Sequence, residues 1–587
     1  MKVLLLHPED RADAGPWSQQ HWDLVVDLAF AGPSTYAEWS QTLKCRVITL
    51  HQFAGQTESY RWIGKMLERG RGRLLDRFGL DWWELLAVFS FHEMHAFYLL
   101  QQLKGELDPA SIQLFATRPH RNAVLLGESL ACPVIYLQKQ RNETSTQLAR
   151  KVEAVRRFGI RQLLEIASDK WDAGYELRGQ FLRHRRAKLK APALLLPSAY
   201  SNVTRTVVQY ANLFPERTFL LAATRSNATS IALPDNVQSV PLGAYATLSK
   251  QSDQEIADLK GAWESFRTNV LGQCEELDQM SRAGVWDSLP KWLGTGIRVR
   301  DAWQELIERE PIEGVLCADD LNVMTRLPVL LANRAGLHTA HTHHGALDGG
   351  FLFKKAYARV HLVKGEMERD YLAATEAVDE ESIVVAAPAP IPAATTRNTG
   401  AGDLVFFSQP CEVDGGRMLE IYRELLPRLC AVGRRVQRSV IVKLHPFESE
   451  RERRRIVDQV LSPDNRALVK IVTAPASDVM RHTWAGVGLD STVAIECVLQ
   501  GIPYFVCGWL DFTGIGYARQ FARYGAGILL NEPSELAGIP DHVSNYAPDW
   551  DRVNLLSHFP GKAKVHDALF GTVPVSESAN SEVRQCV

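Results

Sequence analysis

Short apolar runs alternate with amphipathic stretches along most of this 587-residue chain. "KVLLL" at residues 2–6 is the first run, and "WDLVVDLAF" and "CRVITL" repeat its pattern before an aromatic-rich helical stretch from Tyr60 to about Leu103. "NAVLLGESLACPVIYL" is expected to return to strand character, and Asn142 to about Lys190 to form charged helices. Continuous apolar strands separated by helices are typical of a parallel sheet that is covered on both faces.

A second series of such runs starts at "ALLLPSAY" and includes "RTFLLAAT", "EGVLCADD", "HTAHTHHG" and "ARVHLV". A segment rich in Pro, Ala, Thr and Gly follows it, and a third, very regular α/β pattern comes after that segment. These patterns predict an N-terminal Rossmann-like domain at 1–390 with helical insertions, a linker at 391–402, a C-terminal Rossmann-like domain at 403–570 and a disordered tail at 571–587.

Composition narrows the class of protein. The formal net charge of −2 gives no general reason to expect a nucleic-acid partner, and the nine cysteines have no spacing typical of a metal site. The strongest apolar stretch, "WWELLAVFSF", is interrupted by Glu84 and is shorter than the roughly 20 residues of a membrane span. We therefore expect a soluble, cytoplasmic protein with reduced thiols.

Polar residues follow several predicted strands of the third pattern. Ligands of open parallel sheets bind outside the carboxyl ends of the strands, which is where these residues stand. The candidates for binding a nucleotide are Ser408 and Gln409 after "LVFF", Lys443, His445 and Pro446 after "VIV", and Ser491, Thr492 and Glu496 in "GLDSTVAIE".

Each of these candidates has a structural alternative. Ser491 or Thr492 can act simply as a helix N-cap, and His445 with Pro446 can simply end a strand. In combination, a donor at one strand end and the free N–H groups of a helix start at another can hold a phosphate between them. Glu496, one turn into the helix, is placed to accept hydrogen bonds from a ribose.

"VIVKLHP" followed by "STVAIECVLQGIP" resembles the C-terminal half of GT-B glycosyltransferases that build bacterial surface polysaccharides. The sialyl-, polysialyl- and Kdo-transferase groups, which use CMP-activated sugars, are the most similar. The resemblance extends from about residue 313 to 530 and includes "GLHTAHTHHG". It implies a GT-B fold, in which two Rossmann-like domains face each other across a cleft.

The resemblance also implies an inverting, metal-independent transfer of a sugar, with CMP-linked Kdo or sialic acid favoured as donor, to a growing surface glycan or a lipid-linked glycan. Asp319 or Asp320 of "CADDLN" would be the general base, and His445 would act on the leaving phosphate. Leu321 departs from the pattern, because those families have glycine there. His344 and Gly345 would bind donor or acceptor, and no cofactor or metal is expected.

Two other functions stay open. "LDSTVAIE" partly resembles non-hydrolysing UDP-sugar 2-epimerases, although those proteins are shorter and have two glycines where Thr492 and Val493 stand. A non-catalytic subunit that binds nucleotide or glycan is the second alternative. The basic segments 61–86 and 178–190 fit either a solvated helix face or peripheral contact with the inner membrane. The oligomeric state is not predicted.

Overall fold

The structure, a computed structural model, describes residues 1–53, 58–107, 111–138, 181–247, 249–345, 347, 354–376, 378–389, 401–412, 415–489, 491–512 and 517–571. Most of the expected linker, all but the first residue of the expected tail, and most of the charged stretch after Asn142 lie outside these ranges. The fold is α/β, as predicted, and it contains three parallel, Rossmann-like sheets.

Contacts divide the chain into two compact units, each assembled from three stretches of sequence. Unit 1 comprises 1–59, 92–163 and 392–554, and unit 2 comprises 60–91, 164–391 and 555–587. This division differs from the single boundary at 391–402 that we expected. Residues 1–59 share a unit with 392–554 because their sheets are packed together through one hydrophobic cluster.

The first sheet of unit 1 has five strands in the order β3-β2-β1-β4-β5. They are β1 (Lys2–Leu6), β2 (Leu24–Asp27), β3 (Arg46–Thr49), β4 (Gln113–Ala116) and β5 (Val134–Tyr136), accompanied by α1 (Pro33–Leu43), α4 (Phe91–Gly105) and α5 (Arg121–Leu130). The expected return to strand character after Asn122 is therefore wrong for its first part, which is helix α5. The buried residues of α5 include Ala123, Leu126 and Leu130, which are spaced three and four positions apart as on one face of a helix, whereas a strand would bury every second residue.

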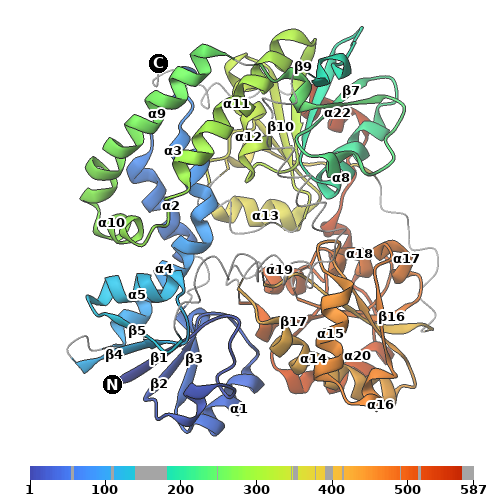
Figure 1. The fold of residues 1–587 in the computed structure, drawn as a ribbon. Coiled ribbons are helices and arrows are strands. Elements are labelled where there is room, and N and C mark those ends of the chain that lie inside the picture. Colours follow the sequence, from blue (N-terminus) through green and yellow to red (C-terminus); the bar gives the residue numbers. More distant parts are fainter. Residues whose placement is uncertain are drawn as a thin grey trace. The chain divides into compact units, whose positions relative to one another are not determined.

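The second sheet of unit 1 has six strands in the order β15-β14-β13-β16-β17-β18. Two of them, β16 and β17, are labelled in Figure 1. They are β13 (Asp403–Phe407), β14 (Val440–Lys443), β15 (Val469–Val472), β16 (Thr483–Gly488), β17 (Tyr504–Cys507) and β18 (Ile528–Leu530), with α14 (Met418–Arg435), α15 (Glu450–Val460), α17 (Ala476–Met480), α18 (Val493–Leu499), α19 (Tyr517–Arg523) and α20 (Ile539–Ser544). The apolar runs of the third sequence pattern predicted these strands: "LVFF", "VIV", "ALVKIV", "AGVGLD", "IPYFVCG" and "GAGILL".

A buried arginine joins the two sheets of unit 1. The Arg417 Nε lies 2.8 Å from both carboxylate oxygens of Asp27 at the end of β2, and its other nitrogens donate to the carbonyl oxygens of His7, Pro8 and Asp10. Asp27 is fully buried, so this ion pair has no competition from water. The guanidinium therefore ties the start of α14 to the loop after β1.

Unit 2 contains a seven-stranded sheet in the order β12-β11-β10-β9-β6-β7-β8. The strands are β6 (Ala193–Ser198), β7 (Thr218–Ala223), β8 (Val237–Pro241), β9 (Ile312–Cys317), β10 (His338–Thr342), β11 (Val360–Val363) and β12 (Ile383–Val385). Helix α22 (Lys562–Phe570), dark red in Figure 1, packs Val565, Ala568 and Leu569 into the core of this sheet. Residues close to the end of the described chain thus return to the sheet of unit 2.

The described part of unit 2 also contains several α-helices. They are α2 (Glu58–Gly70), which begins in unit 1, α3 (Trp82–Ala87), α8 (Ser201–Leu213), α9 (Lys250–Asn269), α10 (Glu275–Arg282), α11 (Leu289–Arg309), α12 (Val323–Arg334) and α13 (Glu366–Thr375). None of the helices in the described ranges combines the length and apolarity that crossing a bilayer requires. Helix α3 carries Glu84 into the interior of the unit.

Candidate functional site

Three neighbouring strands of the six-stranded sheet end in the residues that the sequence singled out. Strands β14, β13 and β16 are adjacent and parallel, so their carboxyl ends share one edge of the sheet. His445 follows β14, Ser408 and Gln409 follow β13, and Ser491 and Thr492 follow β16. The sheet order thus brings to one edge residues that are spread over more than 80 positions of the sequence, from Ser408 to Thr492.

His445 is a neutral hydrogen-bond donor at this edge. Its Nδ1 accepts a hydrogen bond from the backbone N–H of Phe447 at 3.2 Å, which leaves the ring proton on Nε2. Burial, helped by the charge of Lys443, lowers the pKa of His445 to about 4. At neutral pH the half-buried imidazole therefore offers an N–H group and carries no positive charge.

Glu448 fixes the turn that carries His445. One carboxylate oxygen accepts from the backbone N–H of His445 at 2.7 Å, and the other accepts from Ser408 Oγ at 2.7 Å and from Arg453 Nε at 2.6 Å. The Glu448 side chain has no exposed surface. Because both of its oxygens are occupied within the turn, Glu448 supports the histidine and does not face a ligand, and the hydroxyl of Ser408 is committed to the same interior network.

Lys443 also lies in the interior. Its ammonium group donates to the backbone oxygen of Leu444, and burial lowers its pKa, against the opposing effect of Glu448. Gln409 is half-buried, and its backbone oxygen accepts from the N–H of Cys411. Pro446 is exposed beside His445 and has no N–H to donate. Among the candidates after β13 and β14, the imidazole of His445 is the group best suited to contact a ligand.

Ser491 and Thr492 precede α18, a helix of seven residues. Both are half-buried, and Ser491 Oγ accepts from the N–H of Val493 at a long 3.4 Å, while Thr492 makes no side-chain cap. Glu496 is exposed one turn further on, as its proposed contact with a ribose requires. The short helix contributes little dipole, so these residues can act mainly through their hydroxyl and N–H groups.

The other expected site lies at the carboxyl ends of β9 and β10 in unit 2. Asp320 is buried there between two side chains: His341 Nε2 lies 3.1 Å from its Oδ1, and the ammonium of Lys354 bonds the same oxygen. Burial alone would raise the pKa of Asp320, but His341 and Lys354 together hold it well below its usual range. Asp320 is therefore a firmly ionised, enclosed carboxylate.

Asp319 is in a different environment. It is half-buried, and burial raises its pKa, opposed by His344 and reinforced by the charge of Asp320. His344 is positioned by a 2.7 Å hydrogen bond from its Nδ1 to the backbone oxygen of Ala318. The backbone N–H of Gly345 donates to His343 Nδ1 at 3.3 Å. A Cβ atom added to Gly345 would meet no heavy atom within 4 Å apart from its chain neighbours. Among the described residues of this edge, Asp319 and His344 are thus half-buried, whereas Asp320 is enclosed.

The remaining histidines of the "HTHHG" region have separate places. His338, at the amino end of β10, bonds the backbone oxygen of Ala568 on α22. His343 and His361 are neutral, because burial lowers the pKa of His361 to about 3 and that of His343 well below its usual range. Within the described ranges, no group of three or more His, Cys, Asp or Glu side chains is arranged to hold a metal ion.

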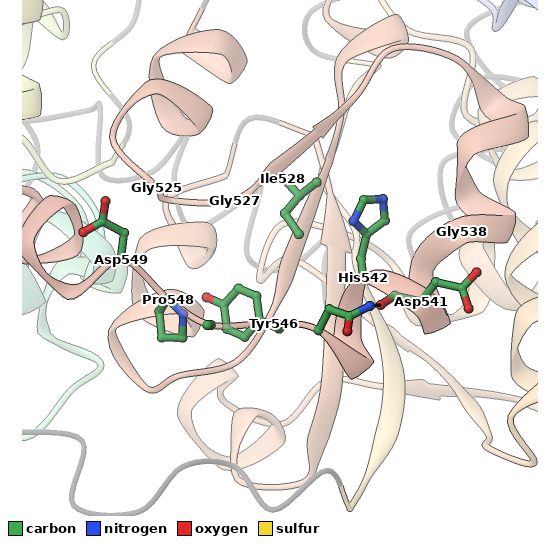
Figure 2. A pocket seen from close by; sticks show the side chains of 11 residues that line it. Gly525, Gly527, Ile528, Gly538, Asp541, His542, Tyr546, Pro548 and Asp549 are labelled. Carbon is green, nitrogen blue, oxygen red and sulfur yellow. Dashed lines mark hydrogen bonds between the residues drawn. The ribbon is translucent and has the colours of Figure 1, made fainter.

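A cavity of about 570 Å³ lies elsewhere in unit 1 (Figure 2). Ile528, the first residue of β18, contributes to its wall, so the cavity is at the amino edge of the six-stranded sheet. His542 comes from α20, and Tyr546 and Asp549 come from the chain that follows that helix. The polar side chains around it are largely exposed. None of the residues expected to bind a nucleotide lines this cavity.

The sequence missed two groups that matter most to these sites. Lys354, the ammonium partner of Asp320, is 34 residues away from it and belongs to no motif. Arg453, which fixes Glu448, is buried although it belongs to "ERERRR", a run of mixed charge that is typical of a solvated helix surface. Arg453 is the fourth residue of α15, and the charged residues on either side of it in the sequence do not indicate that this one side chain is buried.

No protein-family model and no curated protein matches the sequence. Among solved structures, UDP-GlcNAc 2-epimerase from Methanocaldococcus jannaschii in complex with UDP-GlcNAc and UDP matches at 11% identity with a TM-score of 0.39, covering 64% of this chain and 97% of that one. The wall teichoic acid polymerase TagF matches at 10% identity with a TM-score of 0.36, and the match covers 74% of this chain and 100% of that one. A glycosyltransferase from Rickettsia africae ESF-5 matches at 9% identity with a TM-score of 0.38, and the match covers 68% of this chain and 98% of that one. Likenesses this weak identify neither a family nor a substrate.

Proposed function

We propose that the chain is a glycosyltransferase of the GT-B type that moves a sugar from a nucleotide-activated donor to a glycan acceptor. The observation that carries this proposal is the convergence of His445, Ser491 and Thr492 at the carboxyl edge of β14, β13 and β16. Such an edge is where open parallel sheets bind their ligands. The motifs at these positions are also the ones that resemble the glycosyltransferases of surface polysaccharides.

In this proposal His445 donates from Nε2 to the phosphate of the donor, and the hydroxyl and N–H groups of Ser491 and Thr492 donate to the same phosphate. As the bond between sugar and phosphate breaks, negative charge grows on the phosphate oxygens. Hydrogen bonds to those oxygens strengthen as this happens, which favours departure of the nucleotide. Glu496 would contact the ribose.

Asp319, and not Asp320, is the proposed general base. A base must accept a proton, and a raised pKa favours this at Asp319, whereas Lys354 and His341 stabilise the ionised form of Asp320. The acceptor hydroxyl would lose its proton to Asp319 while its oxygen attacks the anomeric carbon, which inverts the configuration there. His344 would orient the acceptor beside this carboxylate.

The nucleotide is tested by a thermal-shift panel of CMP, CDP, UDP and GDP. A ligand that binds only the folded state raises stability by RT ln(1 + [L]/Kd), so the correct nucleotide gives the largest shift. The sequence resemblance favours CMP, and hence a CMP-sugar such as CMP-Kdo or CMP-sialic acid. Equal, negligible shifts for all four nucleotides would contradict the proposed site.

Incubation with UDP-GlcNAc in the absence of an acceptor separates transferase from epimerase, because an epimerase converts the sugar without a second substrate. Conversion at C2 under these conditions would contradict the transferase proposal. Nucleotide binding without transfer to any member of a panel of lipid-linked and free glycans would instead favour the non-catalytic subunit.

A further inference from the structure

A buried ion pair lies next to the segment that supplies Lys354. Arg326 on α12 donates from Nη2 to Glu84 Oε1 on α3 at 2.8 Å, and the same nitrogen donates to the backbone oxygen of Lys355 at 2.7 Å. Both charged side chains are almost completely buried. The guanidinium therefore links α3 to the residue that directly follows Lys354.

The same carboxylate holds the segment at a second point. The hydroxyl of Tyr357 lies 2.8 and 2.7 Å from the two carboxylate oxygens of Glu84, and Arg326 lies over the Tyr357 ring at 5.0 Å. Arg71 Nε is 3.2 Å from Glu84 Oε2 and completes the group. Residues 354–357 are thus tied to Glu84 through the Lys355 carbonyl and through the Tyr357 hydroxyl.

This arrangement does more than attach α3 to α12. The Glu84–Arg326 ion pair alone would join those two helices, but two of the hydrogen bonds in the group go to the 354–357 segment. An interior carboxylate is costly unless it is paired and hydrogen-bonded, so the members of such a group hold one another in a narrow set of positions. Lys354 is consequently presented to Asp320 from a segment with little freedom.

We propose that Glu84 is a positioning residue: through Arg326 and Tyr357 it holds residues 354–357 so that the ammonium of Lys354 stays against Asp320. The consequence for catalysis, a fixed carboxylate beside the base Asp319, rests on the proposed function. The positioning itself can be measured without any substrate.

Competitive acetylation with acetic anhydride, quantified by mass spectrometry of the lysine-containing peptides, reports how often each ammonium group is accessible. In the native protein Lys354 should react slowly relative to Lys260, an exposed lysine on α9. In Glu84→Gln, which removes the charge and keeps the shape, Lys354 should react about tenfold faster because local opening becomes more frequent. Lys260 should be unchanged.

Glu255→Gln is the matched control. Glu255 pairs with the buried Arg300 at 2.7 Å in the same unit, and its described contacts do not include residues 354–357. It should leave the reactivity of Lys354 unchanged. An equal rise in this variant would mean general loosening of unit 2 and would overturn the proposal.

The possible results distinguish the positioning role of Glu84 from the proposed transferase function. Slow labelling of Lys354 in both the native protein and a folded Glu84→Gln variant would contradict the positioning role and leave the proposed chemistry untouched. Labelling of native Lys354 as fast as that of Lys260 would contradict the buried pair itself. If Glu84→Gln does not fold, Tyr357→Phe removes one tie to the segment, and unchanged labelling in that variant would overturn the proposal.

Discussion

Two adjacent aspartates illustrate how the environment assigns different chemistry to identical side chains. Asp320 is enclosed by Lys354 and His341, which keep it ionised, whereas Asp319 is half-buried and has a raised pKa. The sequence predicted that "CADDLN" would stand at a strand end but left the choice between the two open. The choice depends on Lys354, whose contact with Asp320 has no local signal in the sequence.

The two aspartates should respond differently to loss of charge. Asp319→Asn should keep its fold and its nucleotide binding while turnover falls by about 10²–10⁴-fold, the usual contribution of a positioned base. Asp320→Asn should lose about 3–5 kcal/mol of stability, because it removes the carboxylate charge that bonds the buried ammonium of Lys354. Urea denaturation and single-turnover assays with saturating donor measure these two quantities. Full turnover in Asp319→Asn would rule it out as the base.

At the scale of elements, the sequence predicted the strands of the six-stranded sheet and the positions of the polar residues at their ends. It missed β4, which has only four residues, and it took part of α5 for strand. The stretch "NAVLL" is apolar enough for either element, and a run this short cannot be assigned by periodicity alone. Tertiary packing, which buries Ala123 and Leu126 on one helix face, decides in favour of the helix.

The connection between the two sheets of unit 1 gives a prediction at this scale. Arg417→Met should lower the free energy of unfolding by about 3–5 kcal/mol, because it leaves the fully buried Asp27 without its cation. Arg451→Met, at an exposed position of α15, is the control and should change stability by less than about 0.5 kcal/mol. Urea denaturation of the full chain compares them. Equal effects in the two variants would show that the Arg417 ion pair contributes no specific stability.

For the whole molecule, the hydrophobic pattern revealed parallel α/β structure but not which strands share a sheet. Residues 2–49 look like the beginning of one long domain, yet their strands share a sheet with β4 and β5 and not with the strands after residue 190. All of these strands are similar apolar runs, so the pairing depends on long-range packing that no local pattern encodes. Helices α2 and α3 likewise lie in unit 2 although the strands on either side of them in sequence belong to unit 1.

The stability of the chain should fall as the pH decreases from about 6.5 to about 4. Burial lowers the pKa of many histidines below the 6.5 of an unfolded chain, so the unfolded state binds more protons in this range, and unfolding is favoured. The pKa is about 3 for His51 and His361 and about 4 for His92, His95, His120 and His445.

Asp81, whose pKa burial raises to about 6, acts in the opposite direction, as do Asp27, Asp319, Glu420 and Glu424, whose pKa values burial also raises; these carboxyl groups are fewer than the histidines with a lowered pKa. A melting temperature lower at about pH 5 than at about pH 7.5 is therefore expected. A melting temperature that stays constant or rises on acidification would contradict the buried, neutral state of these histidines.

The most direct test of the account is calorimetric titration of the nucleotide that gives the largest thermal shift into the native protein and into His445→Ala. Loss of the hydrogen bond to a charged phosphate should weaken binding by about tenfold to a hundredfold. His482→Ala, which removes an exposed histidine of the same unit, should bind as the native protein does. An unchanged dissociation constant in His445→Ala would contradict the claim that this edge of the sheet binds the donor's phosphate.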